Sequence, residues 1–103
     1  MMLKLSSRHV EITPHLREHI SKQFERLAKL DHGIIQGEVT LTRDRAFDVA
    51  EGKIHVGHTF LTASGRGTNT YTAVNEMFDK VRVQLGKYEG RIKTRRRGRT
   101  RKL

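Results

Sequence analysis

The sequence has no cysteine, no tryptophan and only one proline, Pro14. Without cysteine the chain cannot carry a disulfide framework, a thiolate nucleophile or a cysteine-based zinc site. No segment approaches the ~20 consecutive apolar residues of a membrane span, and residues 1–15 hold no apolar run suited to a signal-peptide core. A length of 103 residues suits one domain and excludes a two-domain enzyme. We therefore expect a single cytoplasmic domain that does not enter a membrane.

Positive charge is concentrated at one end of the chain. The net charge is +10, yet residues 1–86 contribute little, because 10 acidic side chains nearly balance 12 basic ones. Residues 87–103 hold nine basic side chains and one acidic, Glu89. This asymmetry indicates a polyanion partner, either nucleic acid or an anionic membrane surface, and the alternative is a solubilising tail. We place a folded domain at residues 1–92 and a basic tail, disordered when unbound, at residues 93–103.

The first helix is predicted from an apolar stripe that begins just after Pro14. Thr13 is a good N-cap, and proline suits the first helical position because an N–H there would have no helical partner. Gly33 favours the left-handed conformation that often ends a helix. The stripe recurs at steps of three and four residues and consists of Leu16, Ile20, Phe24, Leu27 and Leu30.

Alternating apolar residues predict four strands. Leu3 and Leu5 indicate the first strand, and Gly57-His58 indicates a hairpin turn before a returning strand at residues 59–64. The two strands between them have inward faces made of Ile35, Gly37, Val39 and Leu41, then of Ala50, Gly52, Ile54 and Val56. Residues 65–67 are predicted to break the last strand. A second helix then begins near Asn69, with the stripe Val74, Phe78, Val81, Leu85, Tyr88 and Ile92.

The order β-α-β-β-β-α predicts an α+β fold. Each helix is apolar on one side only, so both stripes are buried when the two helices pack on one face of a four-stranded sheet. The crossover through a helix makes the first two strands parallel neighbours, and the other strands are joined antiparallel, which gives a mixed sheet. This arrangement resembles a double-stranded-RNA-binding fold.

Two rows of basic residues are predicted on the polar sides of the helices. The pairs Glu18–Lys22 and Glu25–Lys29 make an ordinary solvated surface an equally good explanation of the first row. We predict that the second row lacks matching acids at that spacing, which favours RNA or DNA binding. Two such rows can flank a groove that follows a phosphate backbone. They comprise Lys22, Arg26 and Lys29 on the first helix and Lys80, Gln84, Lys87 and Arg91 on the second.

Further basic residues are candidate accessory RNA contacts. Residues 64–67 precede the second helix, so their backbone amides can cradle an anion, although we prefer a plain strand-to-helix turn as the explanation. They lack the spacing of a nucleotide-binding P-loop. The basic tail adds affinity for a polyanion through counterion release. The accessory candidates are Arg66, Lys93, Arg95, Arg96, Arg97, Arg99, Arg101 and Lys102.

The sequence contains no recognisable catalytic or metal-binding constellation. His15 and His19 are one helical turn apart, but no Glu or third His follows at the spacing of a metalloprotease. Asp44, Asp48 and Glu51 offer carboxylates without any sign of an enclosed cleft, and they suit the charges of loops and edge strands better. We therefore expect no enzymatic activity, no cofactor and no metal.

Four short segments form a family signature. They read VEITPHLR at residues 10–17, ASG at 63–65, YTAVNE at 71–76 and KVRVQLGK at 80–87. These segments resemble the ribosome hibernation-promoting factor and ribosome-associated inhibitor family, also described as sigma-54 modulation proteins. The resemblance covers about residues 3–92 in the same element order.

The resemblance implies a function at the small ribosomal subunit. Family members bind the decoding region, occupy the path of messenger RNA and tRNAs, and silence idle ribosomes during stress or stationary phase. For this chain it implies ribosomal-RNA contacts at Arg26, Lys29, Lys80 and Lys87, and the 70S ribosome as the partner of a protein that is monomeric when free. Arg82 points away from the Lys80 and Lys87 row by helical geometry, so we do not count it among the contacts.

Two other functions are consistent with the same features. A helix pair on a sheet also serves generic double-stranded-RNA binders, which recognise shape and phosphates. A regulator that binds another protein, such as a sigma factor, would use the exposed sheet. Co-sedimentation with ribosomes distinguishes these functions from ribosome silencing.

Overall fold

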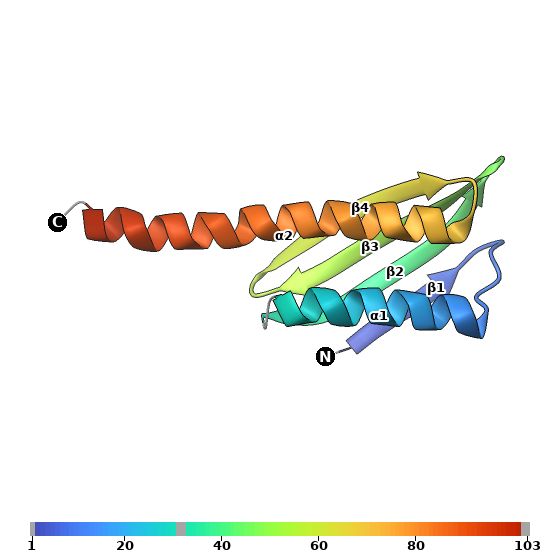
Figure 1. The fold of residues 1–103 in the computed structure, drawn as a ribbon, viewed down its shortest axis with the longest axis horizontal. Coiled ribbons are helices and arrows are strands. Elements are labelled where there is room, and N and C mark those ends of the chain that lie inside the picture. Colours follow the sequence, from blue (N-terminus) through green and yellow to red (C-terminus); the bar gives the residue numbers. More distant parts are fainter. Residues whose placement is uncertain (1, 31–32, 102–103) are drawn as a thin grey trace.

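Two helices cover one face of a four-stranded sheet (Figure 1). The computed structural model describes residues 2–30 and 33–101, with side chains as far as Gly90. The chain forms the predicted elements in the predicted order: β1 (Met2–Ser7), α1 (Pro14–Leu30), β2 (Ile34–Asp44), β3 (Phe47–Val56), β4 (Thr59–Gly67) and α2 (Thr70–Arg101). The α+β class is therefore confirmed.

The sheet is mixed, with the strand order β1-β2-β3-β4. β1 pairs with β2 in parallel, and the other two pairs are antiparallel. α1 is the crossover between the parallel strands, and α2 follows the last strand. The helices lie side by side and run in the same direction, α2 over β3 and β4 (Figure 1). Within the described residues, the opposite face of the sheet carries no helix.

The hydrophobic core lies between the helices and the sheet, and α2 approaches the sheet most closely at Gly65. A Cβ atom at Gly65 would collide with the backbone of Ala73 and Met77. The prediction that residues 65–67 break the last strand was wrong, because β4 continues through them to Gly67 and the missing side chains give α2 room. The largest fully buried side chains are Phe78, Ile20, Leu27, Leu41, Ile54, Met77, Val39, Val56, Val74 and Val81.

Two apolar residues of the predicted core are exposed instead. Ile35 is 51% exposed, whereas Ile34 is 6% exposed. The prediction that Ile35 faces the core was therefore wrong. The cause is an irregularity in the β2–β3 register between Ile34 and Gln36, which exchanges the faces of neighbouring residues. Leu30 is 62% exposed because it is the last residue of α1.

Both predicted helix N-caps are confirmed. The Leu16 N–H donates to Thr13 Oγ1 at 3.1 Å, and the Thr72 N–H donates to Asn69 Oδ1 at 2.9 Å. α2 continues past residue 92 and projects beyond the sheet (Figure 1). Disorder of residues 93–103 in the unbound protein stays a prediction, because residues 102–103 and the side chains of 93–101 lie outside the described part of the chain.

Asp48 joins the β2–β3 hairpin to the start of α2. It is 5% exposed, so the prediction that it is a loop or edge-strand charge was wrong. Arg43 Nε donates to Asp48 Oδ1 at 2.9 Å, and Thr70 Oγ1 donates to Oδ2 at 2.7 Å. The bond from Arg43 lowers the pKa of Asp48 most; Thr70 lowers it further, and burial opposes both. The carboxylate is therefore held in its charged form.

Substituting Asp48→Asn is expected to lower the free energy of unfolding by about 1–2 kcal/mol near pH 7, because the amide loses the charge-assisted bond from Arg43. The folded pKa lies below the unfolded value of about 3.9. The contribution of the carboxylate is thus complete above that value and is lost as pH falls through the folded pKa. Urea unfolding of both proteins at a series of pH values measures the difference, which should shrink below about pH 4. A difference independent of pH would contradict this role.

Candidate nucleic-acid interface

The basic row on α1 consists of Lys22, Arg26 and Lys29, all of them exposed. Lys22 Nζ lies 3.1 Å from Glu18 Oε1, so the acid–base pair that competes with an RNA role does form there. Lys29 has no ion-pair partner in the described part of the chain, although Glu25 stands at the right spacing; Arg26 is likewise unpaired there. The free cations of this row are therefore Arg26 and Lys29.

Lys80 on α2 is not a free cation. Its Nζ lies 3.0 Å from Glu76 Oε1 and donates to the Ser64 carbonyl oxygen at 2.9 Å. The prediction that the second row lacks an acid at helical spacing was wrong, because Glu76 precedes Lys80 by four residues. One turn later, Gln84 Nε2 donates to the Thr62 carbonyl oxygen at 2.6 Å. Two adjacent members of this row, Lys80 and Gln84, thus bind the backbone of β4.

The same α2 side chains protect the outer edge of the sheet. β4 is an edge strand, so one side of its backbone has no strand partner. Lys80 and Gln84 donate to two of its carbonyl groups, while Lys80 and the Arg66 backbone N–H lower the pKa of Glu76. Edge strands with unpaired backbone groups can pair with other chains, and charged side chains discourage that pairing. We call Glu76, Lys80 and Gln84 the β4 edge cap.

Beyond the β4 edge cap, Lys87 is exposed and has no ion-pair partner among the described residues. Arg91 lies on α2, but its side chain is outside the described part. Arg66 on β4 is 3.6 Å from Asp44 Oδ2, and its guanidinium lies 4.5 Å from the centre of the Phe47 ring. The accessory candidates with side chains outside the described part are Lys93, Arg95, Arg96, Arg97, Arg99, Arg101 and Lys102.

The two basic rows do not face each other across a groove, which corrects the sequence prediction. The side of α2 that faces α1 carries Arg82, whose guanidinium donates to Gln23 Oε1 at 2.6 Å and Asp79 Oδ1 at 2.8 Å. Lys80 and Gln84 lie on the other side, over β4. The prediction that Arg82 points away from the Lys80 row is confirmed. A contact surface that includes both rows must therefore extend across the outer sides of the helices.

The two histidines of α1 lie in the contact between the helices. The rings of His15 and His19 lie 5.8 Å and 5.2 Å from the Tyr71 ring, and His19 Nε2 is 2.8 Å from Asn75 Oδ1. The described residues contain no group of three or more metal-ligating side chains. Nor does any helix in that part of the chain have the length and apolar character needed to cross a membrane.

Comparison with known proteins identifies the family. Residues 3–93 match the family described as "Sigma 54 modulation protein / S30EA ribosomal protein". The chain is 30% identical over 93 residues to the ribosome hibernation promoting factor of Escherichia coli K12, covering 90% of this chain and 98% of that protein. It is 31% identical over 97 residues to ribosome-associated factor Y of Haemophilus influenzae, covering 93% and 90%.

Solved structures support the same fold. A ribosomal subunit interface protein from Coxiella burnetii superposes with a TM-score of 0.82 at 20% identity, covering 87% of this chain and 99% of that one. The N-terminal domain of Protein Y from Thermus thermophilus gives a TM-score of 0.76 at 22% identity, covering 82% and 94%. The protein therefore belongs to the sigma-54 modulation protein / S30EA ribosomal protein family, a family of non-enzymatic ribosome-associated factors.

Proposed function

We propose that the protein inhibits translation by binding the small ribosomal subunit and occupying the path of messenger RNA and tRNAs in the decoding region. The family match over residues 3–93 carries this proposal, since it includes all of the sheet except its first residue, Met2, and most of α2. Relatives of nearly the same length are named for ribosome hibernation or ribosome association. The protein would act in the cytoplasm, under stress or in stationary phase, and as a monomer when free.

The free cations on the helices suit ribosomal RNA as the ligand. Arg26, Lys29 and Lys87 are exposed and unpaired in the described part of the chain, so they can reach phosphate oxygens without breaking an ion pair. Lys22 and Lys80 would first have to leave Glu18 and Glu76. The proposed ribosomal-RNA contacts remain Lys22, Arg26, Lys29, Lys80, Lys87 and Arg91, with the largest contributions from the unpaired ones.

The occlusion mechanism predicts competition with tRNA. Binding of the protein to small subunits should weaken as initiator or elongator tRNA fills the decoding sites, because both ligands need the same space. Co-sedimentation of purified 30S subunits with the protein and increasing tRNA measures this competition. Saturable binding of the protein to subunits whose decoding sites are all filled by tRNA would rule out occlusion.

Two controls separate this function from the alternatives. A generic double-stranded-RNA binder would also shift a free RNA duplex in a gel at moderate salt, whereas a decoding-site binder should not. A regulator of a sigma factor would not co-sediment with ribosomes and would bind the sigma factor instead. Retention on 30S subunits at a salt concentration that releases the duplex is the result expected for the proposed function.

A further inference from the structure

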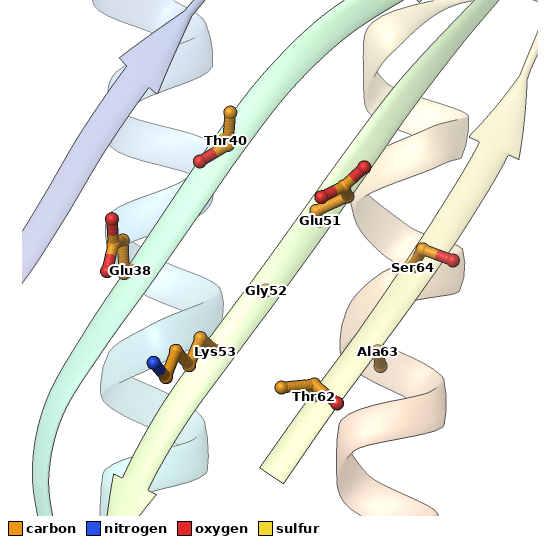
Figure 2. Close-up of a pocket in the computed structure, with 8 residues that line it drawn as sticks. All are labelled: Glu38, Thr40, Glu51, Gly52, Lys53, Thr62, Ala63 and Ser64. Atoms are coloured by element: carbon orange, nitrogen blue, oxygen red, sulfur yellow. The ribbon is translucent and has the colours of Figure 1, made fainter. Parts of the chain in front are cut away.

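The uncovered face of the sheet has a distinct chemistry. Strand register places side chains from all four strands in cross-strand rows on this face. One row near the β3–β4 hairpin contains Gln36, His55 and Phe60, and the next contains Glu38, Lys53 and Thr62. Neither helix lies over these residues, as Figure 2 shows for the central part of the face, where both helices lie behind the sheet.

An exposed aromatic ring lies at the hairpin end of this face. Phe60 is 53% exposed, although an edge strand ordinarily keeps so large an apolar side chain in the core. The His55 ring stacks on it with a centroid distance of 4.5 Å and an interplanar angle of 21°. Lys53 Nζ lies 4.5 Å from the centre of the same ring. An aromatic ring with a cation and an imidazole beside it suits a ligand that is both aromatic and anionic.

A shallow hollow of about 640 Å³ lies on this face (Figure 2), and Lys53, which lies over the Phe60 ring, is one of its lining residues. It contains the carboxylates of Glu38 and Glu51, which would repel a phosphate placed at the centre of the sheet. Carboxylates and hydroxyl groups accept hydrogen bonds from the amino groups of nucleobases, as Glu and Asp do with cytosine. The lining residues are Glu38, Thr40, Glu51, Gly52, Lys53, Thr62, Ala63 and Ser64.

We propose that this face binds an unpaired nucleotide of single-stranded RNA, with the base against the Phe60–His55 rings and its edge toward the hollow. Lys53 is positioned for the adjoining phosphate, because it forms no ion pair with a described residue although Glu38 is its register partner. Aromatic side chains on a four-stranded sheet stack unpaired bases in other RNA-binding proteins. A duplex would not fit this role, because its bases are stacked and its paired edges are occupied.

This inference goes beyond the proposed function, since it assigns a second surface and a different form of RNA from the helix contacts. It can hold even if the basic rows do not touch the ribosome. The matched pair of variants is Phe60→Leu and Phe47→Leu, which make the same change at two exposed phenylalanines of the chain. Phe47 lies at the end of β3 opposite to His55, beside Arg66 and outside the hollow.

The test measures fluorescence anisotropy of the full chain with a short unstructured RNA, with the same RNA made abasic, and with a duplex. Wild-type protein and Phe47→Leu should prefer the base-containing strand to the abasic strand by about tenfold, and Phe60→Leu should lose that preference. Equal binding of both single strands by the wild type, or an unchanged preference in Phe60→Leu, would overturn the proposal. Tighter binding to the duplex than to the single strand would overturn it as well.

NMR spectra supply a second readout that does not depend on a variant. Adding the base-containing strand should shift the ring resonances of Phe60 and His55 through ring currents, and the abasic strand should leave them in place. Ribosome co-sedimentation of the same proteins separates the two proposals. If the protein does not bind ribosomes but binds the oligonucleotide in a Phe60-dependent way, only the proposed function is rejected. If it binds ribosomes but shows no Phe60-dependent binding of the oligonucleotide, only this inference is rejected.

Discussion

Reversing the charges of Lys29 and Lys87 together is expected to reduce the affinity for 30S subunits by at least about 100-fold. Each residue is exposed and without an ion-pair partner in the described part of the chain. Each substitution replaces a charge-assisted contact, worth about 1.5 kcal/mol or more, with repulsion from phosphate. Exposed substitutions of this kind usually change the free energy of unfolding by under ~0.5 kcal/mol. Equilibrium binding to labelled 30S subunits, with urea unfolding in parallel, measures both effects.

Lys80 offers a comparison on the same helix, because it also has a structural role. Lys80→Glu would place a second carboxylate beside Glu76 and remove the donor to the Ser64 carbonyl oxygen. We expect it to lower the free energy of unfolding by about 1 kcal/mol and to expose the edge of β4 to pairing with another chain. Lys87→Glu should instead leave folding unchanged and weaken binding. If the double variant at positions 29 and 87 binds 30S subunits as tightly as the wild type, the assignment of the helix contacts is wrong.

The fold could be predicted from the sequence because its signals are local. The stripes of both helices repeat within a few residues, and the caps Thr13 and Asn69 act on N–H groups three residues away. The parallel pairing of β1 and β2 follows from the single helix between them, because a helix in the connection returns the chain to the end of the sheet where β1 began. Each of these features depends on residues or elements that are close together along the chain.

Three of the errors about the fold involve contacts between distant parts of the chain. Gly65 was predicted to break a strand, yet it lies within β4, where the α2 backbone leaves no space for a side chain. Ile34 rather than Ile35 is buried because the pairing with β3 is irregular there. Asp48 was predicted to be a loop or edge-strand charge, but Arg43 and Thr70 allow it to be buried. Periodicity in one segment carries no information about the segment that packs against it.

In the candidate site too, the spacing of the basic rows does not reveal what packs against them. Helical spacing placed Lys80 and Lys87 in one row, and the structure agrees with that spacing. Spacing could not distinguish them, because Lys80 is held by Glu76 and by the backbone of β4, whereas Lys87 lies beyond the edge cap. A signal for the edge cap was present, since Glu76 and Lys80 are four residues apart. Phe60 also gave a signal, as an aromatic residue at an outward position of an alternating strand.

Neutralising four arginines of the basic C-terminal segment should flatten the salt dependence of ribosome binding. The substitutions Arg95→Gln, Arg96→Gln, Arg97→Gln and Arg99→Gln preserve the chain length and remove four of the seven positive charges in residues 93–103, which contain no acid. Each phosphate contact that is lost lowers the slope of log K against log salt by about 0.7–0.9. The slope should therefore fall by about 3, and the affinity at low salt by about 100-fold or more.

The site of binding should survive this change. Charge alone reads no RNA sequence, so the segment would strengthen and accelerate association while the folded domain would select the proposed site in the decoding region. The variant should therefore still compete with tRNA on 30S subunits, only at higher protein concentration. A purely solubilising segment would give the opposite pattern, with lower solubility and an unchanged slope. Binding of wild type and variant across a salt series distinguishes the two, and parallel lines would exclude the segment as an RNA contact.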